Sequence, residues 1–150
     1  MSKSNNYCVI MAGGVGSRFW PMSTQKFPKQ FQDILGTGRT MIQQTYDRIS
    51  QIVPKENIYV ITNKEYVSLT EQQLPELKPQ NIVGEPMMKN TAACNIYMAK
   101  KIAAENPDAN MIVLPADHLI LKETTFLQKV ELAFNLASQH DYLITLGITP

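Results

Sequence analysis

The sequence lacks the features that mark secreted, disulfide-stabilised or membrane-spanning proteins. It has two cysteines in 150 residues, Cys8 and Cys94, which are too far apart for a disulfide framework or for metal-site spacing. Because both stand among apolar or small residues, we expect buried free thiols. No apolar run approaches the roughly 20 residues of a membrane span, and the run near the N-terminus is short and ends in glycines. These features favour a cytoplasmic location.

Charge of one sign is also scarce. The formal net charge is +1, with 44% hydrophobic and 18% charged residues, which is typical of a globular protein of one domain. We therefore expect no general affinity for nucleic acid or for anionic membranes. The charge is uneven in one segment, where Arg18, Lys26, Lys29 and Arg39 stand against Asp33 alone. We expect this basic segment to lie beside the glycine-rich loop described below.

Apolar, β-branched runs alternate with stretches of helical periodicity. Proline, asparagine and glycine separate them. Such alternation predicts an α/β domain, a Rossmann-like parallel sheet with helices on both faces. For such a sheet we expect the usual strand order, 3-2-1-4. Thr40 and Gln43 have the spacing of a capping box at the start of the first helix. The expected strands are residues 7–11, 58–62, 81–83, 111–114 and 143–146, and three expected helices begin near residues 40, 64 and 90, with a fourth carrying Phe126 and Val130.

A glycine-rich loop follows the first expected strand. Gly13, Gly14 and Gly16 fall within four positions, which indicates a backbone that turns sharply and closely approaches a ligand. Successive backbone N–H groups in such a turn form an anion-binding nest. Arg18 adds a planar fork of donors suited to phosphate oxygens, and Lys29 adds a second cation. The loop therefore predicts a phosphate-binding site.

Two familiar glycine motifs do not fit this loop. A Walker A loop requires Gly-Lys-Ser/Thr five residues after its first glycine, and Arg18 stands there instead. A dinucleotide fingerprint requires a third glycine where this chain has Phe19, so a generic dinucleotide-binding module is disfavoured.

Polar residues follow two later strands. In an open α/β sheet, ligands bind outside the carboxyl ends of the strands, where we expect Glu85-Pro86, Asn90-Thr91 and Asp117. A carboxylate beside a phosphate loop is a natural Mg²⁺ ligand, which makes Asp117 the predicted metal-binding residue. The alternative is that Asp117 only shapes the following turn. His118 is assigned no chemistry.

The loop and the segment after it resemble a known family. Gly-Gly-x-Gly-x-Arg-x-x-Pro-x-Ser over residues 13–23, followed by Pro28-Lys29-Gln30-Phe31, is similar to the signature of the sugar-nucleotide pyrophosphorylases (nucleotidyltransferases), and most similar to its mannose-1-phosphate guanylyltransferase branch. The resemblance implies the nucleotide-diphospho-sugar transferase fold. It also implies transfer of a nucleotidyl group from GTP to mannose 1-phosphate, giving GDP-mannose and pyrophosphate.

The resemblance also implies a role for each site residue. Arg18 would hold the leaving phosphates, Lys29 would contact the phosphates near the α position, and Asp117 would hold Mg²⁺. The loop would cradle the triphosphate, and the segment after the third strand would contact base and ribose. The implied nucleotide-binding residues are Ala12, Gly13, Gly14, Gly16, Ser17, Glu85, Pro86, Asn90 and Thr91.

Members of this family run to more than twice 150 residues. We therefore expect residues 1–150 to be the N-terminal, nucleotide-binding part of a longer nucleotidyltransferase domain, cut at its C-terminal end, with the sugar pocket and a second metal ligand outside it. Two alternatives stay open: a sister pyrophosphorylase that uses another base or sugar, and a non-catalytic nucleotide-binding regulatory subunit. A homo-oligomer is also left open.

Overall fold

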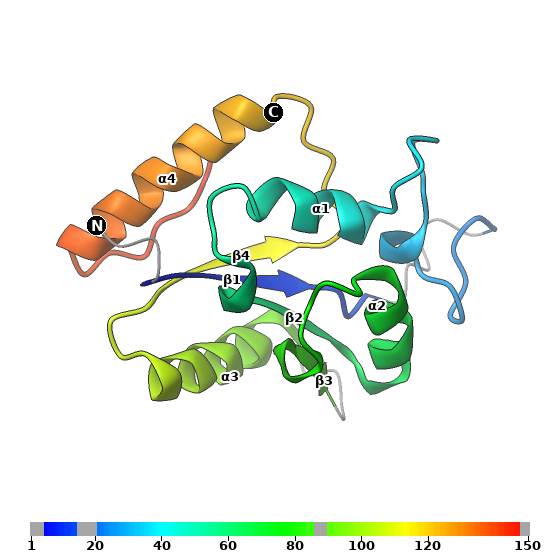
Figure 1. The fold of residues 1–150 in the computed structure, drawn as a ribbon, viewed down its shortest axis with the longest axis horizontal. Coiled ribbons are helices and arrows are strands. Elements are labelled where there is room, and N and C mark those ends of the chain that lie inside the picture. Colours follow the sequence, from blue (N-terminus) through cyan, green and yellow to red (C-terminus); the bar gives the residue numbers. More distant parts are fainter. Residues whose placement is uncertain (1–4, 15–20, 86–89, 148–150) are drawn as a thin grey trace.

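The sheet is the centre of the structure, a computed structural model that describes residues 5–14, 21–85 and 90–147. Its described strands are β1 (Asn6–Met11), β2 (Ile58–Asn63), β3 (Ile82–Glu85) and β4 (Asn110–Pro115), all parallel and in the order β3-β2-β1-β4 (Figure 1). The predicted α/β class, parallel sheet and strand order are confirmed. β3 begins and ends later than predicted, so Glu85 is its last residue, paired with Asn63, and does not follow it.

Four α-helices connect and follow the strands: α1 (Met41–Ile49), α2 (Val67–Gln73), α3 (Asn90–Glu105) and α4 (Glu123–Gln139). Short 3₁₀ turns stand before several elements, namely η3 (Lys29–Phe31), η4 (Lys55–Asn57), η5 (Lys64–Tyr66) and η6 (Pro79–Asn81). The predicted helix from residue 64 therefore begins as η5 and continues as α2. The predicted capping box at α1 is present, with Thr40 N–H donating to Gln43 Oε1 at 3.0 Å.

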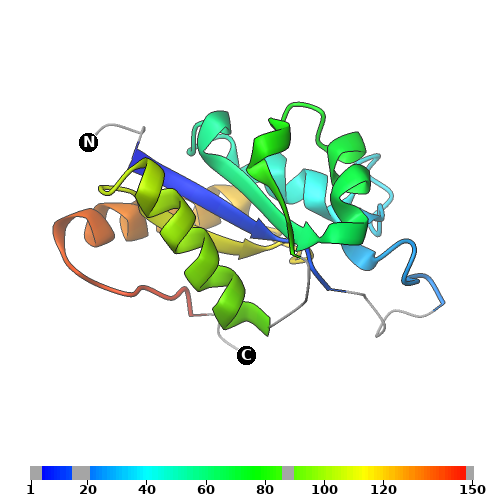
Figure 2. The same cartoon turned by 90° about the horizontal axis from the view of Figure 1, so that it is seen from below.

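Alternate strand residues face two separate apolar layers, as the period of two in a β-strand requires. Cys8 and Ile10 of β1 pack with α1, α2 and α4 on one face of the sheet. Tyr7 and Val9 pack with Met98 and Ile102 of α3 on the other face (Figures 1 and 2). Both cysteines are buried free thiols, as predicted. Because helices cover both faces of the sheet, a ligand can approach it at the ends of the strands.

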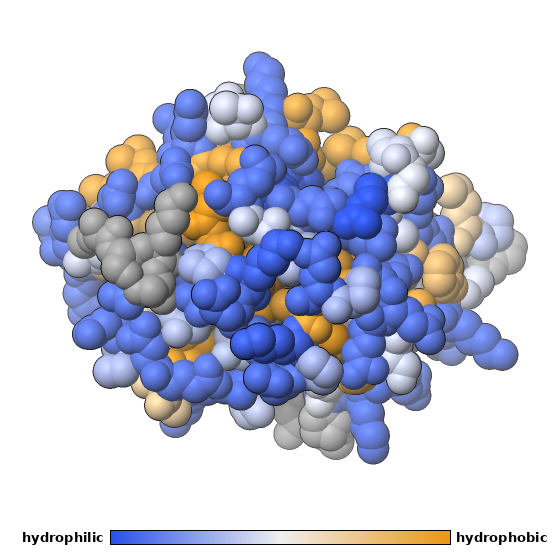
Figure 3. All heavy atoms as spheres, viewed as in Figure 1, coloured by the Kyte–Doolittle hydropathy of each residue, from blue (hydrophilic) through white to orange (hydrophobic). Residues whose placement is uncertain are grey.

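The strand predicted over residues 143–146 is absent from the described chain. Residues 141–147 carry no helix or strand, and Leu143 is fully exposed. β-propensity describes a side chain's fit to a half-buried pleated surface, and a strand also needs a neighbour to bond with. The described strands provide no such neighbour for this segment. Apolar patches interrupt an otherwise largely hydrophilic face of the molecule (Figure 3).

Among the described helices, none combines the length and the apolar character needed to cross a bilayer.

Candidate functional site

The candidate site lies at the carboxyl end of β1, between the ends of β2 and β4. Beyond Met11 the chain continues the ladder on both sides: Ala12 N–H donates to Ile61 O at 2.8 Å, and Ala116 N–H donates to Met11 O at 3.0 Å. Met11 pairs with Pro115, the last residues of β1 and β4, so Gly13 and Asp117 each stand two residues beyond a paired strand end. The sheet thus brings the start of the glycine-rich loop and the predicted metal ligand to one place.

Lys29 and Asp117 meet at this edge. Lys29 Nζ lies 3.7 Å from Asp117 Oδ2 and donates to the Asp117 backbone carbonyl at 3.4 Å. The Lys29 side chain is 18% exposed and that of Asp117 46% exposed. An ion pair this accessible contributes only about 0–1 kcal/mol to stability, so its position at the mouth of the glycine loop is its more informative property. It places one cation and one anion together at the carboxyl end of β4.

Gln30, the next residue of η3, is turned the other way, into the protein. Its side chain is buried, and its Nε2 donates to Ala12 O at 2.8 Å and to Gly14 O at 2.9 Å. Thr62 of β2, also buried, donates from Oγ1 to Ala12 O at 2.9 Å. Sequence reasoning assigned neither residue a role. The available signal was a glutamine between a cation and Phe31, which is fully buried.

The carboxylate of Glu85 faces the other side of the glycine loop. A Cβ placed on Gly13 would stand 3.7 Å from Glu85 Oε2, so the carboxylate lies near the start of the loop with room for no more than a small group between them. Burial raises the pKa of Glu85 above its usual value. Burial also raises the pKa of Cys94, in the first turns of α3, to about 11, and the charge of Glu85 adds to that rise. Glu85 is therefore a partly desolvated hydrogen-bond acceptor.

Asn90 and Thr91 open α3, as predicted, and both are exposed. Asn90 has a φ of 66°, in the left-handed region that asparagine tolerates better than most residues. The predicted site residues Gly16, Ser17, Arg18 and Pro86 lie outside the described residues.

The basic segment does not gather at the site as a whole. Arg39 forms a two-point ion pair with Asp47 of α1, with distances of 2.9 Å from Nε and 2.7 Å from Nη2. Asp33 accepts hydrogen bonds from the N–H groups of Thr37 and Gly38 in its own turn. Of the segment's described cations, Lys29 is the one shown beside the glycine loop. Arg39 is paired instead with an acid on the neighbouring helix.

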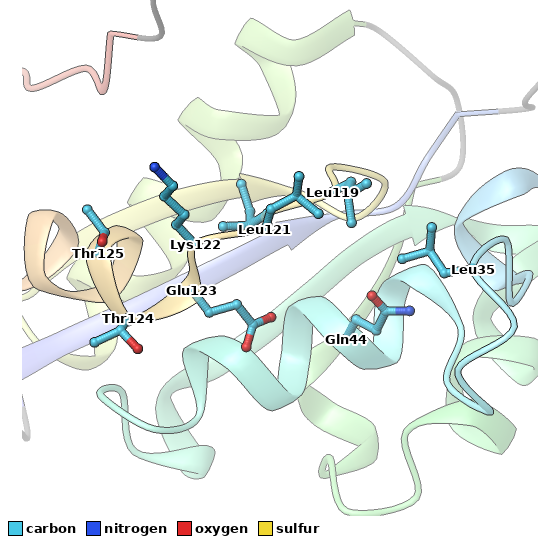
Figure 4. Close-up of a pocket in the computed structure, with 9 residues that line it drawn as sticks. Leu35, Gln44, Leu119, Leu121, Lys122, Glu123, Thr124 and Thr125 are labelled. Atoms are coloured by element: carbon cyan, nitrogen blue, oxygen red, sulfur yellow. The ribbon is translucent and has the colours of Figure 1, made fainter.

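A pocket of about 630 Å³ opens between α1 and the start of α4 (Figure 4). Neither Lys29 nor Asp117 lines it, so it is distinct from the residue set above. Its lining residues are Leu35, Gln44, Leu119, Ile120, Leu121, Lys122, Glu123, Thr124 and Thr125.

The described residues contain no group of three or more His, Cys, Asp or Glu side chains able to hold a metal together. Among the described residues, Asp117 thus has no cluster of further acidic or histidine ligands beside it. Mg²⁺ suits such a site, since it commonly binds one or two carboxylates and fills its remaining positions with water and phosphate oxygens.

Comparisons with known proteins agree with this geometry. A family model described as nucleotidyl transferase matches residues 7–150. The mannose-1-phosphate guanylyltransferase of Escherichia coli is 39% identical over 144 residues, covering 95% of this chain and 30% of the relative. The alginate biosynthesis protein AlgA of Pseudomonas aeruginosa is 37% identical over 142 residues, covering 93% of this chain and 29% of the relative. This chain thus spans roughly three-tenths of the length of these relatives.

Solved structures support the fold. A Thermus thermophilus protein described as mannose-1-phosphate geranyltransferase superposes with a TM-score of 0.74 at 26% identity, over 85% of this chain and 37% of that one. A Helicobacter pylori mannose-6-phosphate isomerase gives a TM-score of 0.68 at 20% identity, over 90% of this chain and 47% of that one, and bears on the fold alone. Since the family model spans nearly the whole sequence, the chain belongs to the nucleotidyl transferase family.

Proposed function

We propose that the chain is the nucleotide-binding part of an enzyme that transfers a guanylyl group from GTP to mannose 1-phosphate, giving GDP-mannose and pyrophosphate. The observation that carries this proposal is the Lys29–Asp117 pair at the glycine loop, 3.7 Å apart. The choice of base and sugar rests on the relatives named mannose-1-phosphate guanylyltransferase. Cytoplasmic location and the lack of nucleic-acid and membrane partners remain predictions of the sequence.

In the proposed reaction the phosphate of the sugar attacks the α-phosphorus of the nucleotide, and pyrophosphate leaves. No protein nucleophile is required, because phosphoryl-type transfer is catalysed mainly by positioning and by neutralising charge on oxygen. Lys29 would neutralise charge near the α-phosphate, and Arg18 would hold the leaving phosphates. The proposed catalytic residues are these two.

The remaining residues would bind the nucleotide. Backbone amides of the glycine-rich loop would bind phosphate, and the segment after β3 would contact base and ribose. Glu85, a desolvated acceptor beside Gly13, is suited to the amino group of guanine. The proposed binding residues are Ala12, Gly13, Gly14, Gly16, Ser17, Glu85, Pro86, Asn90 and Thr91.

Mg²⁺ is the proposed cofactor, and Asp117 would hold it. The fit rests on the accessible carboxylate at the end of β4, beside the proposed phosphate loop. When bound there, Mg²⁺ would act as a Lewis acid and a template for the phosphates. Lys29, which pairs with Asp117 in the structure, would then pair with a phosphate group.

A thermal-shift panel on this chain tests the proposal. It compares GTP, UTP, dTTP, CTP and ATP, each with and without Mg²⁺. A ligand at about 100 times its Kd should stabilise the chain by ~2.7 kcal/mol. A Mg²⁺-dependent shift selective for GTP supports the guanylyltransferase. Selectivity for another triphosphate would point to a sister pyrophosphorylase, and the absence of a shift with all five would contradict a nucleotide-binding role for this chain.

A further inference from the structure

The first residues of the glycine-rich loop are held from behind by one buried side-chain amide. Gln30 Nε2 donates both its hydrogens to this loop, at 2.8 Å to Ala12 O and at 2.9 Å to Gly14 O. Gln30 is 4% exposed. A buried amide whose two donors both reach one short backbone segment fixes that segment more tightly than either bond alone would.

Holding these carbonyls also sets the direction of the N–H groups. A peptide unit is planar and trans, so its C=O and N–H point to opposite sides. The Ala12 carbonyl is occupied by Gln30 and by Thr62 Oγ1 at 2.9 Å, which directs the N–H of Gly13 away from both. Glycines have the most backbone freedom to lose, so without such a restraint this segment would sample many orientations.

The same short turn links the loop to the charged pair. In η3, Lys29 reaches Asp117 at the end of β4, and Gln30 reaches the loop after β1. The turn is itself anchored: Phe31 is fully buried, and its carbonyl accepts from Gln73 Nε2 at 2.9 Å. One rigid turn therefore sets both the backbone donors and the lysine.

We propose that Gln30 is a positioning residue that fixes the backbone of the glycine-rich loop for binding of the nucleotide's phosphates. This inference rests on the proposed function, and it adds a residue that touches neither the nucleotide nor the sugar. The arrangement follows the logic of preorganised backbone donors, which bind developing or existing negative charge without first having to be ordered.

The test uses the 150-residue chain with GTP and Mg²⁺, and measures Kd by calorimetry. Gln30→Met keeps the size of the side chain and removes both donors. We expect its Kd to rise roughly tenfold or more, the order expected when two hydrogen bonds to backbone carbonyls are lost.

Gln32→Met is the matched control: Gln32 Nε2 also donates to two backbone carbonyls, those of Met22 and Phe27 at 2.5 and 2.8 Å, but not to Ala12 or Gly14. Its Kd should stay within about twofold of wild type.

Gln30→Glu supplies a readout that a merely structural role would not give. An ionised carboxylate can only accept and would face two carbonyl oxygens, whereas a protonated one can donate to one of them. Its affinity relative to wild type should therefore recover as the pH is lowered from about 8 to about 5, since burial and these acceptors raise the pKa of the introduced acid. A constant ratio across that range would contradict the proposal.

Backbone ¹⁵N relaxation of the free chain gives a test without any ligand. Gly13 and Gly14 should be rigid in wild type, with order parameters near about 0.85, and should fall below about 0.6 in Gln30→Met. Two results would overturn the role of Gln30 and leave the proposed function standing. One is unchanged order parameters in Gln30→Met, and the other is a Gln30→Met variant that binds GTP as tightly as the wild type does. A wild type that binds no triphosphate would overturn the proposed function and, with it, this role for Gln30.

Discussion

The ammonium group of Lys29 lies 3.7 Å from the carboxylate of Asp117, and the two residues are 88 positions apart in the chain. The lysine thus occupies the neighbourhood of the carboxylate proposed to hold Mg²⁺. A phosphate group bound beside them would attract both Lys29 and Mg²⁺, which then need not compete. Without phosphate the two cations would compete for one carboxylate, so the proposed site predicts that metal affinity depends on the presence of nucleotide.

Lys29→Met should therefore change metal binding and nucleotide binding in opposite directions. Without nucleotide, Asp117 loses its cationic partner, and the Kd for Mg²⁺ should fall about two- to fivefold, the scale of an accessible ion pair. With Mg²⁺ present, GTP should bind more weakly because a phosphate-facing cation is gone. Mg²⁺ titrations followed at the Asp117 amide by NMR measure the first effect and calorimetry the second.

Lys55→Met is the control, since Lys55 also pairs with an acid, Glu76, but at an exposed position away from the glycine loop. It should leave both affinities unchanged. Weaker Mg²⁺ binding in Lys29→Met would show that the lysine does not compete for Asp117.

Asp117→Asn should remove the Mg²⁺ dependence of GTP binding. The amide keeps the shape of the side chain and loses the charge that Mg²⁺ requires. We expect the ratio of GTP affinities with and without Mg²⁺ to approach one, measured by calorimetry. Asp47→Asn, which removes another ion-paired carboxylate, should retain the wild-type ratio. A ratio that survives in Asp117→Asn would place the metal elsewhere.

The sequence was enough to predict the four described strands, and that the glycine-rich loop and Asp117 follow the ends of neighbouring strands. Apolar runs and helical periods predict alternating strands and helices, for which 3-2-1-4 is the usual strand order, and parallel strands place their carboxyl ends on the same side of the sheet. This is why Gly13 and Asp117 could be expected together.

Contacts made by side chains across the fold were not predictable in the same way. The hydrogen bonds from Gln30 to the glycine-rich loop depend on the path of η3 past that loop. The pairing of Arg39 with Asp47 depends on the turn before α1. Residues 143–146 have a strand-like composition, but composition does not show whether a neighbouring strand is there to pair with.

Gly84→Ala should destabilise the fold. A Cβ at this position of β3 would stand 2.8 Å from Val67 Cγ2 and 3.2 Å from the Lys64 Cα, so the start of α2 would have to move. Overpacking of this kind costs about 1–3 kcal/mol of unfolding free energy, measured by urea denaturation.

Adding Val67→Ala should restore part of the lost stability, because it removes the closer contact and leaves the contact with the Lys64 backbone. Gly147→Ala, which meets nothing within 4 Å, should be neutral; full stability in Gly84→Ala would show that β3 can move away from α2 at little cost.

The preference for GTP over ITP should depend on the ionisation of Glu85. These nucleotides differ only in the 2-amino group, a donor whose hydrogen bond a carboxylate can accept. The ratio of their Kd values therefore cancels the effect of pH on the phosphates that they share. A hydrogen bond to a charged acceptor should favour GTP roughly tenfold or more at neutral pH. Burial raises the pKa of Glu85, so protonation begins at a higher pH than for an exposed glutamate, and the preference should decline as the pH falls through that raised value.

Glu85→Gln should show a smaller, pH-independent preference for GTP. Glu71→Gln, an exposed change on α2, should match wild type. A GTP preference that is equal in Glu85→Gln and wild type at every pH would assign guanine recognition to another residue.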